Sequence, residues 1–146
     1  MAEADRFALW RFVEAQAVNY ADAIRELRAG RKTSHWMWYV LPQLRGLGRS
    51  EYSFRYGLTG LAEARAYLAH PLLGPRLLDC ARAILSHDGL TAAEIMGKVD
   101  GQKLQSTATL FALADPDGPV SDAMRAILAR HYGGQNCPRT KAMLSG

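Results

Sequence analysis

The residues best suited to chemistry are concentrated between Gly30 and Ser50, where the sequence reads G-R-K-T-S-H-W-M-W-Y-V-L-P-Q-L-R-G-L-G-R-S. This segment contains two of the three tryptophans, a histidine and several cationic or hydroxyl side chains. Rigid aromatic rings beside a few convergent polar groups are typical of a ligand site. They are also typical of a well-packed junction between a helix and a loop, so the segment predicts a site without naming a reaction.

Two helix starts in the sequence favour an anionic ligand. Lys32 precedes Ser34, which we expect to cap a short helix. A helix amino terminus flanked by cations attracts anions. Asp100 is expected to cap a later helix that carries Lys103 one turn on, together with several hydroxyl residues. The predicted ligand-binding residues are Lys32, Ser34, Trp36, Trp38, Tyr39, Gln43, Arg49, Lys103 and Thr107.

A catalytic role, if this site has one, is predicted for His35 and Asp100. Histidine is the side chain most often used for acid–base catalysis near neutral pH. Asp100 would then orient His35, and Lys32 or Lys103 would stabilise anionic charge. The plainer interpretation is that the lysines are solvated and the aromatic rings belong to the core, since apolar helical positions are mostly buried.

Two classes of function follow from these residues. The first is a small-ligand-binding domain for an anionic, phosphate-bearing or nucleotide-like metabolite, and the sequence leaves open whether it is an enzyme. The alternative is a protein-interaction or regulatory module that uses an exposed aromatic patch and has no catalytic activity, because Trp and Tyr are common interface anchors. A third hypothesis is RNA or DNA binding through the basic region 25–55.

The overall composition is that of a folded, soluble protein. Hydrophobic residues make up 49% and charged residues 22% of the 146-residue chain. We expect one helical domain over residues 1–146, with a polar tail at 135–146. The longest apolar run, Trp36 to Leu41, is too short to cross a bilayer, and the start of the chain lacks the apolar segment of a signal peptide. We therefore expect no membrane association.

Charge and cysteine content restrict the partners further. The net charge of +4 comes from 18 basic and 14 acidic residues that are interleaved, whereas a nucleic-acid binder more often has a dense basic stripe. A small anion or a protein is thus the expected partner. Cys80 and Cys137 are expected to be free thiols in a reducing cytoplasm. The histidines are far apart, and no metal-ligand or nucleotide-loop motif is present, so we expect neither metal nor cofactor.

Hydrophobic periodicity predicts an all-α fold of six or seven helices in a compact bundle. The first and longest is expected from Asp5 to about Ala29, with Gly30 as its stop. Gln16 lies inside its apolar stripe and is expected to bond to a loop backbone, or alternatively to face the pocket. An irregular connection is expected from Gly46 to Gly60. Further helices are expected near residues 35–41, 61–70, 75–84, 91–96, 100–111 and 120–131. The fourth helix has one apolar face made of Leu73, Leu77, Cys80 and Ile84, and Thr91 with Glu94 predicts a capping box at the start of the fifth.

An ordered set of longer motifs carries a family resemblance over nearly the full length. They read A-Q-A-V-N-Y at 15–20, G-R-K-T-S-H-W-M-W at 30–38, P-Q-L-R-G-L-G-R-S at 42–50, Y-L-A-H-P-L-L-G-P-R-L at 67–77, I-M-G-K-V-D-G-Q-K-L-Q-S-T-A-T-L-F at 95–111 and Y-G-G at 132–134. In these motifs the chain resembles domain-of-unknown-function family 1810, a bacterial family often labelled "calpastatin".

The resemblance implies a multihelical single domain and no established activity. The protease inhibitor named calpastatin is a long, flexible, charged chain, whereas this sequence has the composition and caps of a folded helical domain. The tail departs from the pattern that the resemblance implies, in which an acidic residue is followed by Thr and then by Leu-Leu. Here Cys137, Pro138 and Arg139 precede Thr140.

Overall fold

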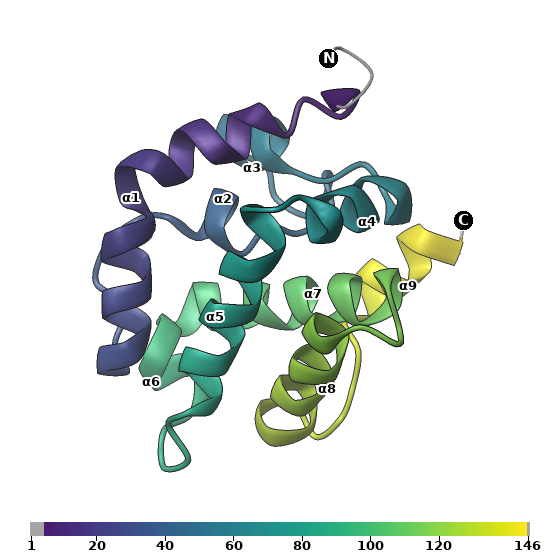
Figure 1. Ribbon diagram of the computed structural model, residues 1–146. Coiled ribbons are helices and arrows are strands. Elements are labelled where there is room, and N and C mark those ends of the chain that lie inside the picture. Colours follow the sequence, from purple (N-terminus) through teal and green to yellow (C-terminus); the bar gives the residue numbers. More distant parts are fainter. Residues whose placement is uncertain (1–4, 146) are drawn as a thin grey trace.

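The structure, a computed structural model, describes residues 5–145, and these form helices with only one isolated bridge between extended residues. The predicted all-α fold is confirmed. None of the helices in this part of the chain is long and apolar enough to cross a membrane. The helices are α1 (Trp10–Ala29), α2 (Met37–Val40), α3 (Glu51–Tyr56), α4 (Leu61–Ala69), α5 (Leu73–Leu85), α6 (Ala92–Met96), α7 (Lys98–Ala114), α8 (Pro119–His131) and α9 (Pro138–Ser145) (Figure 1).

The long first helix begins later than predicted. The predicted Asp5 cap is wrong, because the N-cap position is Leu9, which makes no side-chain cap bond. The Asp5 carboxylate instead accepts hydrogen bonds from Leu9 N at 2.6 Å and Trp10 N at 3.2 Å, just ahead of the helix. Between these residues Ala8 has a φ of 54°, and a left-handed residue cannot continue a helix. At the other end Gly30 stops α1 as predicted, with a φ of 81° that suits glycine.

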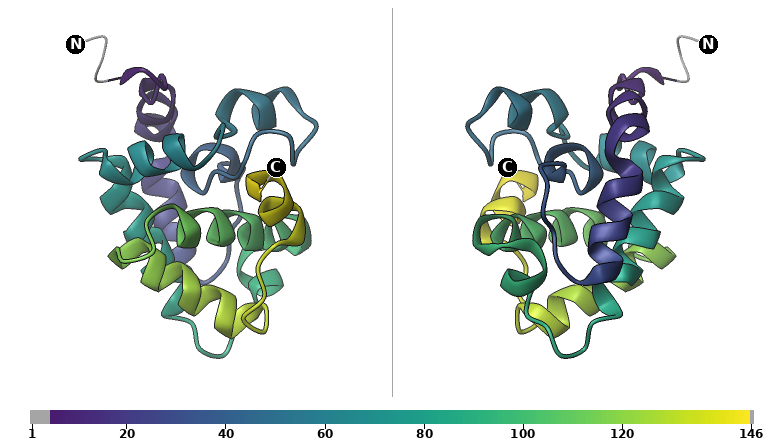
Figure 2. Two further views of the ribbon diagram at one scale, coloured as in Figure 1. Left: turned by 90° about the vertical axis from the view of Figure 1, so that its right-hand side faces the viewer. Right: turned by 90° about the vertical axis from the view of Figure 1, so that its left-hand side faces the viewer.

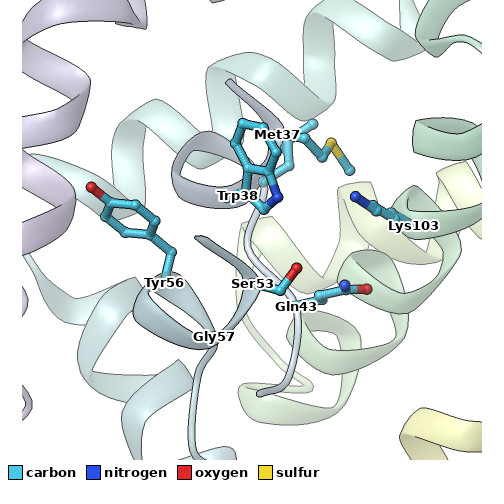
Figure 3. Close-up of a pocket in the computed structure, with 8 residues that line it drawn as sticks. Met37, Trp38, Gln43, Ser53, Tyr56, Gly57 and Lys103 are labelled. Carbon is cyan, nitrogen blue, oxygen red and sulfur yellow. The ribbon is translucent and has the colours of Figure 1, made fainter. Parts of the chain in front are cut away.

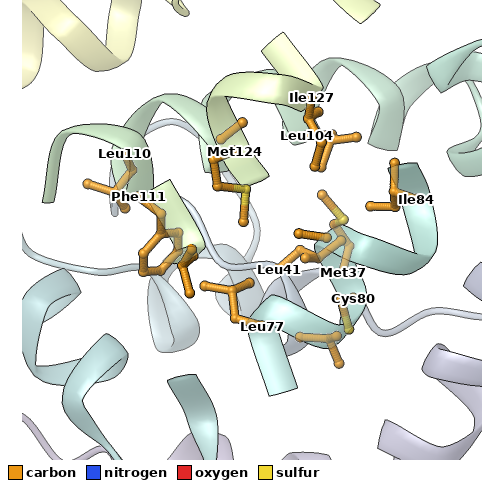
Figure 4. Packing of buried hydrophobic residues seen from close by; sticks show 14 of the residues in the cluster. Met37, Leu41, Leu77, Cys80, Ile84, Leu104, Leu110, Phe111, Met124 and Ile127 are labelled. Carbon is orange, nitrogen blue, oxygen red and sulfur yellow. The ribbon is translucent and has the colours of Figure 1, made fainter. Parts of the chain in front are cut away.

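The core is one connected hydrophobic cluster in which α5 and α7 are central. Helix α7 packs against α4, α6, α8 and α9, while α5 packs against α1, α4 and α8. The apolar stripe predicted for the fourth helix is confirmed, since its side chains are fully or almost fully buried on α5, which packs against α1, α4 and α8. These side chains are Leu73, Leu77, Cys80 and Ile84, and Figure 4 shows the last three among other core residues. Gln16 is also buried, and its amide donates to Tyr39 O at 2.7 Å, in agreement with a structural role.

Two helices lie where the sequence predicted none. Helix α3 falls inside the expected irregular connection 46–60, and α9 occupies most of the expected polar tail. Figure 2 shows α3 and the amino-terminal half of α1 at one end of the molecule, and α9 beside α7. Helix α3 buries no residue, so it has no apolar stripe for a periodicity argument to find. Its start is fixed by Ser50, whose side chain accepts from Ser53 N at 3.0 Å.

Helix α9 is attached to α7 through Cys137. The backbone N–H of Cys137 donates to Thr109 Oγ1 at 2.8 Å, and Ser106 Oγ donates to Cys137 Sγ at 3.3 Å. Both cysteines are free and buried, but their surroundings differ. Burial, together with the nearby charge of Asp79, raises the pKa of the Cys80 thiol to about 12. Burial also opposes ionisation of Cys137, yet hydrogen bonds to its sulfur, including that from Ser106, lower its pKa.

We therefore expect iodoacetamide to modify Cys137 well before Cys80 in the folded protein, because the thiolate is the reactive species. The measurement is mass spectrometry of the two cysteine peptides over time, from pH 6 to pH 9. The Cys137→Ser variant should leave a protein that reacts only when it is unfolded. Equal rates at the two cysteines in the native protein would contradict this expectation.

Candidate functional site

Glu26, on the buried side of α1, organises the segment that the sequence singled out. Its Oε1 accepts hydrogen bonds from Thr33 N at 2.8 Å, Ser34 N at 3.0 Å and Trp36 Nε1 at 2.9 Å. The Ser34 hydroxyl donates to Oε2. The predicted Ser34 cap of α2 is therefore wrong: the N-cap position is Trp36, which makes no side-chain cap bond, because Ser34 is held by Glu26. Helix α2 is accordingly only four residues long.

These hydrogen bonds make the Glu26 carboxyl more acidic than that of an ordinary glutamate. Burial favours its neutral form, but the bonds from Ser34, Thr33 and Trp36 outweigh that effect and lower the pKa from 4.5 to about 2. The Trp36 ring is itself 1% exposed. The carboxylate thus stays ionised at neutral pH and acts as an anchor for the loop, and Trp36 belongs to the core.

Lys32 is committed to a buried ion pair. Its Nζ lies 2.7 Å from Asp100 Oδ2 and donates to Ser34 O at 2.5 Å, and only 6% of the side chain is exposed. The prediction that Asp100 caps its helix is wrong, because α7 begins at Lys98 with Gly97 as its N-cap. Asp100 instead lies in the first turn, where a carboxylate is favourable near the helix amino terminus.

Of the two lysines predicted to bind an anion, Lys32 and Lys103, Lys103 is the more exposed. Its Nζ lies 3.8 Å from Asp100 Oδ1 and 5.7 Å from the centre of the Trp38 ring, and 27% of its side chain is exposed. Since Asp100 already bonds Lys32 at 2.7 Å, the three charges leave a net charge of +1 beside Trp38. This excess positive charge can attract an anion.

A hollow opens next to Lys103, between α2, α3 and the first half of α7. Its empty volume, counted with the open solvent at its mouth, is about 260 Å³, but the space that the centre of a water molecule can occupy is only about 10 Å³. Figure 3 shows Lys103 extending toward Trp38, with Ser53 and Gln43 nearby. Apolar walls and a few polar groups are the usual make-up of a small-ligand pocket. The lining residues are Met37, Trp38, Leu41, Gln43, Ser53, Tyr56, Gly57 and Lys103.

The hollow is shaped by a short pairing of two distant loop segments. Leu58 N donates to Gln43 O at 3.0 Å, and Arg45 N donates to Leu58 O at 2.8 Å. This bridge places Gln43 opposite Gly57 and brings α3 over α2. A Cβ at Gly57 would lie 2.6 Å from Arg45 Cα, so only glycine permits the approach.

The predicted ligand-binding residues separate into different environments. Trp38, Gln43 and Lys103 line the hollow. Thr107 is fully buried and donates to Leu41 O at 2.8 Å, which supports α2 from beneath. Tyr39 is 6% exposed and its hydroxyl donates to His35 O at 3.3 Å; burial raises its pKa. Both residues hold the walls of the hollow in place.

The remaining predicted residues lie outside the hollow. His35 is exposed, and within residues 5–145 no hydrogen bond joins it to Asp100, whose ion pairs go to Lys32 and Lys103. The predicted His35–Asp100 pair is thus not assembled in this structure. Arg49 is exposed and borders an open depression on the outer side of α3.

Sequence reasoning missed Glu26 and the α3 part of the wall. Glu26 did give a signal: it lies between Ile24 and Leu27 on the buried side of α1, where a carboxylate needs partners. Tyr56 stood out only as one of several aromatic residues in the connection 46–60, and Ser53 gave no signal, because α3 follows no apolar period. In the described part of the chain, no three His, Cys, Asp or Glu side chains are grouped so that they could hold a metal ion.

Fold and site together define a small all-α protein with an aromatic-walled, cation-bearing surface hollow. The sequence matches the family described as "protein of unknown function (DUF1810)" over residues 6–144, and the chain belongs to this family, which confirms the resemblance found in its motifs. The chain is similar to a crystal structure of the conserved hypothetical protein Rv1873 from Mycobacterium tuberculosis. The two are 49% identical, with a TM-score of 0.93 over 97% of this chain and 99% of that chain. No curated protein matches the chain.

Proposed function

We propose that the hollow beside Lys103 binds a small anionic metabolite that carries a phosphate or carboxylate group. The observation that carries the proposal is the position of Lys103, a partly exposed cation 5.7 Å from the Trp38 ring at the edge of an aromatic-walled hollow. Gln43 and Ser53 add hydrogen-bonding groups on the same wall. In a ligand site with mostly apolar walls, a small number of polar groups fix the orientation of the ligand and provide specificity.

The volume of the hollow limits what can enter it. The space that the centre of a water molecule can occupy is about 10 Å³, roughly enough for one water, and the value of about 260 Å³ includes open solvent at the mouth. The hollow therefore has room for the tip of a small anionic group, and the rest of a ligand would lie outside it against Trp38 and Lys103. A nucleotide-like ligand would insert one end and leave the remainder outside. The proposal concerns binding and assigns no acid–base step to His35 and Asp100.

The test is a thermal-shift and calorimetric titration of the protein with inorganic phosphate, short-chain carboxylates and phosphorylated sugars. A ligand that binds only the folded state raises the melting temperature. We expect Lys103→Met to reduce the affinity for a binding anion by at least tenfold and to leave the melting temperature of the free protein within a few degrees of wild type. The control is Lys98→Met, which removes an exposed lysine from the first turn of the same helix without touching the hollow.

Lys32 provides a second comparison. From the sequence alone, Lys32→Ala and Lys103→Ala are both expected to abolish ligand binding and to leave thermal stability nearly unchanged. In the structure, however, the Lys32 side chain is buried against Asp100. Lys32→Met should therefore lower the melting temperature clearly, whereas Lys103→Met should act on binding. Absence of binding by every anion in the panel, or equal binding by wild type and Lys103→Met, would refute the proposal.

A further inference from the structure

Helix α3 presents an outer face on which two aromatic side chains are largely exposed. Phe54 is 64% and Tyr52 is 52% exposed, and no residue of α3 is buried. The inner side of the helix is held by ring contacts, with centroids 5.0 Å apart between Tyr52 and Trp38 and 5.2 Å apart between Tyr56 and Tyr39. Its backbone carbonyls are held as well. Arg45 Nε donates to Phe54 O at 2.9 Å, and Arg11 Nε donates to Arg55 O at 2.7 Å. Phe54 differs from the two tyrosines because most of its ring stays in solvent, with the Arg45 guanidinium against one face. A large apolar side chain that gains little from burial in the free protein is available to a partner.

The same surface has an excess of positive charge. Arg45, Arg49 and Arg55 surround the exposed rings, and none of the three belongs to an ion pair formed within the described chain. The guanidinium carbon of Arg45 lies 4.3 Å from the centre of the Phe54 ring. Glu51 is the carboxylate among them. An open depression of about 1,000 Å³, including solvent, is lined by Arg49, Ser50, Glu51, Tyr52, Phe54 and Arg55.

We infer that the outer face of α3 docks an acidic peptide segment of a partner protein, with an aromatic or apolar side chain seated beside Phe54. Charge complementarity identifies the occupant: unpaired guanidinium groups next to exposed rings favour carboxylates that flank an apolar anchor. Neither Phe54 nor Arg55 lines the hollow beside Lys103, so this surface is separate from the proposed small-anion site.

Single-stranded nucleic acid fits the surface less well. Such ligands need a continuous basic groove and free ring faces for stacking. Here Glu51 lines the depression, where it would repel a phosphate backbone, and one face of Phe54 is covered by Arg45. A peptide can space its carboxylates to avoid Glu51.

The experiment is a selection of peptides from a random display library on the wild-type protein. Peptides that bind equally to the double variant Phe54→Ala/Arg55→Ala are removed. We expect a consensus in which Asp or Glu flanks an aromatic or large apolar residue. The selected peptide, made synthetically, should bind the double variant at least tenfold more weakly than wild type, with an affinity that falls as salt rises.

The matched control is Val18→Ala/Arg82→Ala, which removes one exposed apolar side chain and one exposed arginine from other helices. It should bind the peptide as wild type does. No enriched sequence, a consensus without acidic residues, or equal loss in both double variants would overturn the inference. Tighter binding of oligothymidylate than of the selected peptide, lost in the same α3 variant, would also overturn it in favour of nucleic acid.

Discussion

Glu26→Ala is expected to lower the free energy of unfolding by about 3–5 kcal/mol, a large part of the stability of a domain this size. The substitution leaves the donors of Thr33, Ser34 and Trp36 without their acceptor. Each buried donor that loses its partner costs roughly 1–3 kcal/mol, and those of the loop recover part of this by turning to water. Urea denaturation followed by circular dichroism measures the loss.

Glu14→Ala is the natural control, since Glu14 lies on the same helix, is exposed and makes no hydrogen bond or ion pair in the described structure. Its effect should stay within about 0.5 kcal/mol, as for most surface substitutions. If the two alanine variants were equally stable, Glu26 could not be the anchor of the loop.

The pH dependence of stability gives a second measurement on the same carboxylate. Its pKa falls from 4.5 to about 2 on folding, which corresponds to roughly 3 kcal/mol of stability. Because the folded-state pKa is the lower one, this stability is complete above pH 4.5 and is lost as the pH falls toward 2. Glu26→Gln should remove that dependence, so that wild type loses about 2 kcal/mol more than the variant between pH 7 and pH 3. If the free energies of unfolding of wild type and Glu26→Gln fell in parallel as the pH was lowered, the pKa of Glu26 would not change on folding.

The helices that local rules could predict are those whose signals lie within their own segment. The Thr91–Glu94 capping box forms as predicted, and the apolar period of α5 is buried as predicted. Helix α3 has neither a stripe nor an acidic capping box. It is fixed by Arg11 and Arg45, which reach it from outside the helix, and no window over residues 51–56 contains that information.

The site was predictable as a region but not as a set of contacts. Two expected helix starts predicted Lys32, Asp100 and Lys103 as site residues. The sequence could not show that Asp100 pairs closely with Lys32 and only loosely with Lys103. That difference arises from how α6 and α7 fold back on the end of α1, where Lys32 N bonds Ile95 O at 2.6 Å. Tertiary packing thus decides which of the two lysines stays partly exposed.

Arg11→Met is expected to cost about 3–5 kcal/mol, because removing one partner of a buried ion pair leaves the other charge uncompensated. The Arg11 side chain is 10% exposed and lies 2.8 Å from Glu63 Oε2, and the Glu63 side chain is 2% exposed. Arg11 also donates to the carbonyls of Phe7, Arg55 and Gly57 at 2.6, 2.7 and 3.3 Å. One guanidinium therefore joins the start of α1 to α3 and α4.

A double-mutant cycle separates the charge from these backbone bonds. Glu63→Gln added to Arg11→Met removes the uncompensated carboxylate, so the double variant should be more stable than Arg11→Met alone, while the lost bonds to Arg55 and Gly57 keep it below wild type. Arg25→Met is the control, because the Arg25–Asp22 pair is largely exposed and such pairs contribute under about 1 kcal/mol. Equal destabilisation by Arg11→Met and Arg25→Met would show that α3 is positioned by something other than Arg11.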